Sequence, residues 1–129
     1  MNKIISWTIL ALILGQSLVC AGEIHIATGA DKLDRVKSLI ESNRANLEAK
    51  DKWGETPLII AIKLELLTMV QELIKMGARV DDSALGFADI SKNSNIQAEV
   101  LRARMNQDAK DFLLQKQKKQ DEPVGPNNE

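Results

Sequence analysis

The stretch from Lys50 to Asp81, KDKWGETPLIIAIKLELLTMVQELIKMGARVD, contains signals for a turn, two helices and a second turn, in that order. The segment Asp51 to Gly54 is typical of a tight turn, because Asp and Gly tolerate the backbone conformations that turns require. Thr56-Pro57 predicts the start of a helix, with Thr as the cap and Pro at the first helical position. Gly77 follows a second helical run, where a left-handed cap favours glycine. The stretch therefore predicts a helical hairpin between two turns.

The same apolar pattern occurs twice along the chain. Four apolar residues, Leu33, Val36, Leu39 and Ile40, recur 34 positions later as Leu67, Val70, Leu73 and Ile74. Ile26 and Ala27 recur as Ile60 and Ala61 at the same offset. The spacing i, i+3, i+6 and i+7 places the apolar side chains on one stripe of a helix. Asn43 takes the place of the capping glycine in the first copy, since Asn also tolerates the left-handed region.

These residues resemble the ankyrin repeat. The T-P-L at Thr56 to Leu58 and the G-A-x-V-D at Gly77 to Asp81 are similar to the family's motifs, and the helical stripe between them fits its outer helix. The resemblance covers about residues 23–90 and implies an all-α fold: an ankyrin-repeat solenoid of stacked helix-turn-helix units with a C-terminal capping helix.

The chain departs from the family's pattern at several positions. Ile59 stands where the family usually has His, and Glu65 replaces the usual glycine between the two helices. The third repeat is degenerate, because only Ser83 to Ala88 is similar to T-P-L-H-x-A. This segment follows Asp82 directly, so we expect the turn segment between the second and third repeats to be deleted.

The last third of the chain predicts a long helix and then a tail. Apolar residues recur at helical spacing over about residues 95–118, and they are Ile96, Val100, Leu101, Met105, Ala109, Phe112 and Leu113. Ser94 or Asn95 is the expected cap. We expect the first half of this helix to close the third repeat, since terminal repeats must cover their apolar face. The segment Phe112 to Leu114 either folds back onto the stack, which we favour, or offers a partner site. The repeat domain is thus expected over residues 22–114, with a disordered tail over 115–129.

Residues 1–21 are expected to be a secretory signal peptide. Lys3 gives a positive start, an apolar run follows from Ile4 to Leu14, and small residues precede a cut after Ala21. An uncleaved anchor is the alternative, because the apolar segment approaches the about 20 residues that span a bilayer. A cut would remove Cys20, the only cysteine. A small exported domain without disulfides favours a bacterial periplasm or bacterial secretion.

The composition argues against several classes of function. A formal charge of −1 at pH 7 provides no basic field for nucleic acid. His25 is the only histidine, so no second histidine or retained cysteine would complete a metal site with it. The sequence has no Gly-rich phosphate loop and no carboxylate pair placed for acid–base chemistry. We therefore expect no enzyme activity, no catalytic residue, no cofactor and no metal.

The resemblance instead implies a protein-binding module that presents turn tips and inner helices as a concave face. The exposed variable positions by this resemblance are Lys52, Trp53, Glu55, Lys63 and Leu64. Trp53 is of interest because tryptophan is enriched in interface hot spots, although it could instead pack on its own turn or on the first repeat. We expect a protein partner, a monomeric chain, and membrane contact only if the N-terminal segment is uncleaved. A membrane-tethered scaffold and a secreted effector or toxin-neutralising protein are the alternative functions.

Overall fold

The computed structural model describes residues 22–42 and 45–121, and these residues form helices and turns with no β-strand. The first helix covers residues 22–29. The remaining helices are α2 (Leu33–Glu41), α3 (Pro57–Lys63), α4 (Leu67–Lys75), α5 (Asp82–Ile90) and α6 (Ser94–Asp121). We call the connection over residues 45–56 the finger. The prediction of an all-α protein is confirmed.

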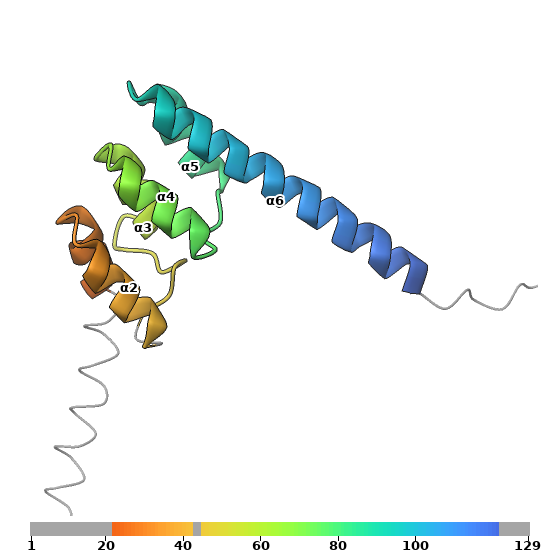
Figure 1. Ribbon diagram of the computed structural model, residues 1–129, viewed down its shortest axis with the longest axis horizontal. Helices are drawn as coiled ribbons and strands as arrows, with labels where there is room; N and C mark the ends of the chain where they lie inside the picture. The colour runs from red at the N-terminus through yellow and green to blue at the C-terminus, as the bar shows by residue number, and fades with distance from the viewer. Residues whose placement is uncertain (1–21, 43–44, 122–129) are drawn as a thin grey trace, which may run out of the picture.

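The helices are arranged as a stack of hairpins (Figure 1). α2, α4 and α6 lie side by side along the stack, and α3 and α5 lie behind them. Helix α3 contacts α4 and α5, while α6 contacts α4 and α5. One apolar core runs through all the hairpins, and its largest fully buried side chains include Ile24, Leu39, Leu58, Ile62, Met69, Leu73 and Ile96. The predicted stack of helix-turn-helix units is therefore confirmed.

Residues 34 positions apart occupy equivalent places in the first two hairpins. Val36 and Val70 are both fully buried, and Leu39 and Leu73 are buried as well. The flanking pairs, Leu33 with Leu67 and Ile40 with Ile74, are half-buried in both hairpins. The same side chains thus face the core in both copies, as the repeated stripe predicted.

The capping residues of the second repeat behave as the sequence predicted. The Thr56 hydroxyl accepts the Ile59 N–H at 3.4 Å, and Pro57 occupies the first position of α3. Gly77 follows α4 with φ of 103°, a conformation that glycine adopts without a steric penalty. Asn43, the expected cap of the first repeat, lies outside the described residues.

The turn between the two helices of a repeat also has a positive φ, although neither repeat has glycine there. Glu65 has φ of 58°, and Asp31, 34 positions earlier, has φ of 55°. This conformation costs a non-glycine residue about 1–2 kcal/mol. The Glu65 carboxylate offsets part of that cost, because it accepts the Ser91 hydroxyl at 3.3 Å and the Lys92 N–H at 3.2 Å. The glutamate thereby links the second repeat to the third.

The third repeat lacks a finger, as the sequence predicted. Asp81 caps α5 directly, and its carboxylate accepts the Ala84 N–H at 2.8 Å. Buried positions of the second repeat recur here at an offset of 27 instead of 34, pairing Pro57 with Ala84, Ala61 with Ala88, Met69 with Ile96 and Leu73 with Val100. The shorter offset keeps both helices of the third repeat and removes the connection before them.

Helix α6 is longer than predicted at both ends. It begins at Ser94, and the cap is neither Ser94 nor Asn95 but Asn93, whose side-chain oxygen accepts the Asn95 N–H at 3.1 Å and the Ile96 N–H at 3.4 Å. The helix continues to Asp121. Residues 115–121 are therefore helical, which corrects the predicted start of a disordered tail at 115. Residues 122–129 lie outside the described part of the chain.

The prediction that Phe112 to Leu114 fold back onto the stack is wrong. Their side chains are 56%, 64% and 56% exposed. A helix rises 1.5 Å per residue, so Phe112 lies about 14 Å along the axis from Ala103, a residue that still contacts the core. Figure 1 shows that the C-terminal half of α6 extends past the other helices of the stack. The helix continues without a bend, so these residues have no repeat beneath them.

Side chains of α6 hold the segment 78–81 that precedes α5. Gln107 accepts the Val80 N–H at 3.0 Å through its side-chain oxygen, and Arg104 donates to the Val80 carbonyl at 2.9 Å. On the other side of this segment, the Glu48 carboxylate of the finger accepts the Arg79 N–H at 2.8 Å. The segment is therefore fixed between the finger and α6.

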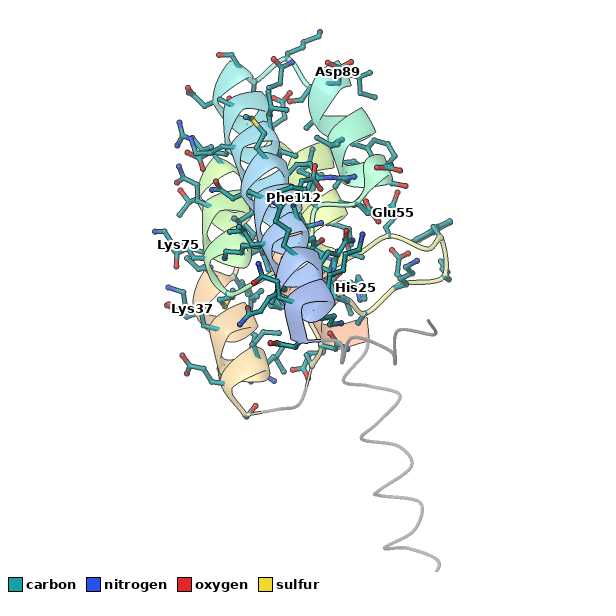
Figure 2. The ribbon with its side chains drawn as sticks, turned by 90° about the vertical axis from the view of Figure 1, so that its right-hand side faces the viewer. His25, Lys37, Glu55, Lys75, Asp89 and Phe112 are labelled. Atoms are coloured by element: carbon teal, nitrogen blue, oxygen red, sulfur yellow. The ribbon has the colours of Figure 1, made fainter. Side chains whose placement is uncertain are left out.

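An ion-pair cluster joins the first two repeats on the α2–α4 face. The Glu72 carboxylate pairs with two ammonium groups. Its Oε2 atom lies 2.9 Å from Lys37 Nζ, and its Oε1 atom lies 3.0 Å from Lys75 Nζ. These hydrogen bonds, first that of Lys37 and then that of Lys75, hold the pKa of Glu72 below its ordinary value of 4.5. The bond to Glu72 in turn raises the pKa of Lys37 above 10.5. Lys37 and Lys75 are labelled in Figure 2.

The sign of these shifts gives a pH dependence. A carboxylate with a lowered folded-state pKa stabilises the fold above its ordinary pKa, and this stabilisation is lost as the pH falls through the lowered value. We therefore expect Glu72→Gln to lower the urea midpoint at neutral pH and to have a smaller effect at about pH 3. The control is Asp89→Asn, because Asp89 is exposed and its side chain forms no ion pair within residues 22–42 and 45–121. An equal loss for Glu72→Gln at both pH values would contradict the role of the ion pair.

Candidate functional site

Asp51 organises the finger from within. Its side-chain oxygen accepts the N–H groups of Trp53 and Glu55, each at 2.9 Å, and its carbonyl accepts the Gly54 N–H at 3.0 Å. Burial acts to raise the pKa of the Asp51 carboxyl, but the two hydrogen bonds outweigh it and the pKa lies below its ordinary value of 3.8. Gly54 has φ of 76°, which favours glycine. The turn predicted for this segment is confirmed, and its conformation is fixed by hydrogen bonds.

His25 fixes the base of the finger to the first repeat. Its ring nitrogen Nε2 lies 2.9 Å from the Ala49 carbonyl and 3.1 Å from the Glu55 carbonyl. The side chain is buried, at 8% exposure. It therefore contacts both limbs of the finger, 24 and 30 residues further along the chain. Figure 2 shows His25 beneath the finger and Glu55 on it. The structure confirms a structural position for the only histidine.

Trp53 lies at the tip of the finger and remains accessible to solvent. Its side chain is 72% exposed, and the Lys52 ammonium lies 4.2 Å from the ring centroid. The ring is therefore not buried against the first repeat, and the contact that it makes with its own turn is the one with Lys52. A lysine over a tryptophan face is a cation–π contact, which at an exposed site contributes about 0.5–1 kcal/mol. Lys52 and Trp53 thus form one local unit at the tip.

Glu55, Lys63 and Phe87 connect the finger to the inner helices. The Lys63 ammonium lies 2.5 Å from the Glu55 carboxylate and 5.3 Å from the ring centroid of Phe87. Lys63 belongs to α3 and Phe87 to α5, so this chain of contacts crosses from the finger to the third repeat. Of the predicted residues, the structure places Glu55 and Lys63 together.

Leu64 lies toward the first repeat, away from the Lys63 chain of contacts. It is 51% exposed. A Cβ atom added at Gly29 would lie 4.0 Å from the Leu64 side chain and 4.0 Å from that of Ile60, which places Leu64 next to the helix over residues 22–29. The five predicted positions therefore run from the tip of the finger across both sides of α3.

Sequence reasoning missed a groove next to these residues. It has a volume of about 480 Å³ and lies between α3 and α5, lined by Ile62, Lys63, Glu65, Phe87, Ile90, Ser91 and Lys92. Ile90 is 75% exposed. At the offset of 27, Phe87 corresponds to Ile60 and Ile90 to Lys63, which places both on the inner-helix face. That offset was a signal available in the sequence, but the deleted finger obscured it.

Two other kinds of site would require metal ligands or a membrane-spanning helix. Across residues 22–42 and 45–121 there is no group of three or more His, Cys, Asp or Glu side chains that could hold a metal ion. Within the same ranges, no helix combines the length and the apolar character needed to cross a membrane.

The stacked hairpins, the finger and the exposed inner-helix face together define a helical repeat protein with a docking surface. The chain belongs to the ankyrin-repeat family, because the family model "Ankyrin repeats (3 copies)" matches residues 24–121. This match includes the third repeat and all of α6. Ankyrin repeats are protein–protein interaction modules, and this is the general class of the protein.

The chain is also similar to segments of larger known proteins. It is 34% identical over 91 residues to "Neurogenic locus notch homolog protein 1" of Xenopus tropicalis, covering 66% of this chain and 4% of that protein. The protein of the same name from Danio rerio is 35% identical over 91 residues. A "Putative ankyrin repeat protein" of Rickettsia felis is 37% identical over 68 residues, covering 53% of this chain and 17% of that protein. The chain therefore spans only a small part of the length of these relatives.

The bonds at His25 predict how the finger is held. His25→Ala leaves two carbonyl groups of the finger without this partner, which typically costs about 1–3 kcal/mol. We expect faster amide hydrogen exchange over residues 45–56 and a lower melting temperature. Ile26→Ala is the matched control, because the neighbouring Ile26 is 73% exposed and should change neither measurement. Unchanged exchange of the finger in His25→Ala would contradict the anchoring role.

Proposed function

We propose that this protein binds a partner protein through Lys52, Trp53, Glu55, Lys63 and Leu64, without catalysing a reaction. The observation that carries the proposal is Trp53, a large aromatic side chain that is 72% exposed on a turn held by internal hydrogen bonds. An exposed tryptophan on a rigid turn loses little conformational freedom on binding, so most of its buried area contributes to affinity.

The surroundings of Trp53 support the proposal. Lys52 and Lys63 are exposed, and the Glu55–Lys63 ion pair forms a charged border beside the apolar side chains of the inner helices. An apolar centre with a polar rim is the usual composition of a protein interface. The proposed absence of catalysis is supported by His25, whose ring contacts two backbone carbonyls in a buried place.

Replacing Trp53 tests this function. We expect Trp53→Ala to weaken partner binding about tenfold or more, because tryptophan anchors commonly contribute over 1 kcal/mol. Its melting temperature should not change, since the ring is mostly exposed. Partners captured on the tagged chain would be identified by mass spectrometry and their affinity measured for both forms. Lys75→Ala is the matched control, because Lys75 is exposed on α4, away from the finger. Equal affinity for Trp53→Ala and the unmodified chain would contradict the proposed surface.

We also propose that the protein is exported by a bacterial cell to the periplasm or the medium. This rests on residues 1–21, with Lys3, the apolar run from Ile4, and Val19 and Ala21 at the −3 and −1 positions of the expected cut. We expect N-terminal sequencing of the exported protein to give Gly22 as the first residue. An intact N-terminus on a membrane-bound form would instead favour the membrane-tethered scaffold, and an intact N-terminus on a form free in the cytosol would contradict export.

A further inference from the structure

Helix α6 has two faces of different character. Its inward face contains Ile96 and Val100, both fully buried. Successive residues of a helix are 100° apart, so Leu101, Met105 and Phe112 fall within about 40° of one another and about 140° from the buried face. These three side chains are 54%, 64% and 56% exposed. The outward face of the last helix is therefore an apolar row, which Ala98, Ala109 and Leu113 extend.

This row is unusual for the end of a repeat stack. A terminal unit has no neighbour beyond it and needs a polar outer face to stay soluble. The helix over residues 22–29 lies with α2 at the opposite end of the stack (Figure 1).

We propose that α6 pairs with α6 of a second copy of this chain. The two helices run antiparallel and are related by a two-fold axis that passes between them at the level of residue 107. The protein is then a dimer, in place of the monomer expected from the sequence. This interface lies on the outward face of α6, whereas the partner surface proposed above lies on the finger and α3, so either proposal can fail without the other.

The antiparallel register matches apolar residues with apolar residues. It places Leu101 opposite the partner's Phe112 and the partner's Leu113, and Met105 opposite the partner's Ala109. A parallel register would instead place each residue opposite itself.

Charge favours the antiparallel orientation as well. The register brings Glu99 to within one residue of the level of the partner's Lys116, which lies just beyond the end of the row. Lys116 forms no ion pair among the described residues and lies 5.0 Å from the ring centroid of Phe112. Glu99 is 28% exposed and bonds Arg102 at a long 3.4 Å. In a parallel pair, Lys116 would meet the same lysine and repel it.

Sedimentation equilibrium of residues 22–129, which include the whole packed core, tests the dimer. We expect a dimer with a dissociation constant on the order of 10 µM, since a single helix pair is smaller than a standard interface. Met105→Glu and Phe112→Glu should each weaken it about tenfold or more, because they place a charge in the row. At about 1 µM, below the expected dissociation constant, the circular dichroism melt should stay unchanged, because both side chains are exposed in the monomer. Ile90→Glu is the control, because Ile90 is 75% exposed but lies on the inner-helix face, and its dimer should be unaffected.

Cysteine cross-linking tests the orientation, because residues 22–129 contain no cysteine of their own. A mixture of Met105→Cys and Ala109→Cys chains should form a mixed disulfide. Leu101→Cys alone should not cross-link, because the two copies of this residue would lie about 18 Å apart along the axis, beyond disulfide reach. Lys116→Glu should weaken the dimer, and adding Glu99→Lys should restore it.

Three results would overturn the proposal. The first is a monomer at concentrations of about 100 µM, well above the expected dissociation constant. The second is a dimer that Met105→Glu and Phe112→Glu leave intact. The third is efficient cross-linking of Leu101→Cys to itself, which would show a parallel pair.

Discussion

The structure depends on the burial of an apolar stripe that no single hairpin can cover alone. Val70 and Leu73 on α4 are fully buried because hairpins lie on both sides of them, one formed with α2 and one with α6. Truncating a buried leucine commonly costs about 2–5 kcal/mol, a large share of the about 5–15 kcal/mol that stabilises a folded domain. The middle hairpin therefore holds both ends of the stack in place, and every exposed feature is positioned relative to it.

The candidate site is a consequence of this packing. The finger has no regular secondary structure, yet His25 fixes it to the first repeat, Asp51 closes its turn, and Glu48 joins it to the segment before α5. The His25 contact comes from a helix that the core has already oriented, so the finger is anchored to a fixed base. Trp53 takes part in the turn through its backbone N–H, which Asp51 accepts, and its ring remains 72% exposed at the tip.

Much of the fold could be predicted from the sequence, because helix caps and apolar periodicity are local signals. Thr56-Pro57, Gly77 and the repeated stripe from Leu33 to Leu73 all behave as predicted. The course of α6 could not be predicted, since periodicity does not show whether a helix bends back after Val100. Phe112 to Leu114 read as core residues in sequence but extend beyond the last repeat. The groove at Phe87 and Ile90 was also missed, because the deleted finger shifts the repeat offset from 34 to 27.

The bonds of Gln107 and Arg104 to Val80 also make the third repeat a support for the second. Val80 is buried in the segment between α4 and α5, and both polar groups of its backbone find their partners on α6. Removing α6 would therefore do more than expose apolar side chains, because it would leave a buried N–H and a buried carbonyl without these partners, at a typical cost of about 1–3 kcal/mol each. Shortening the chain by its last helix should for this reason loosen the exit from the middle hairpin as well.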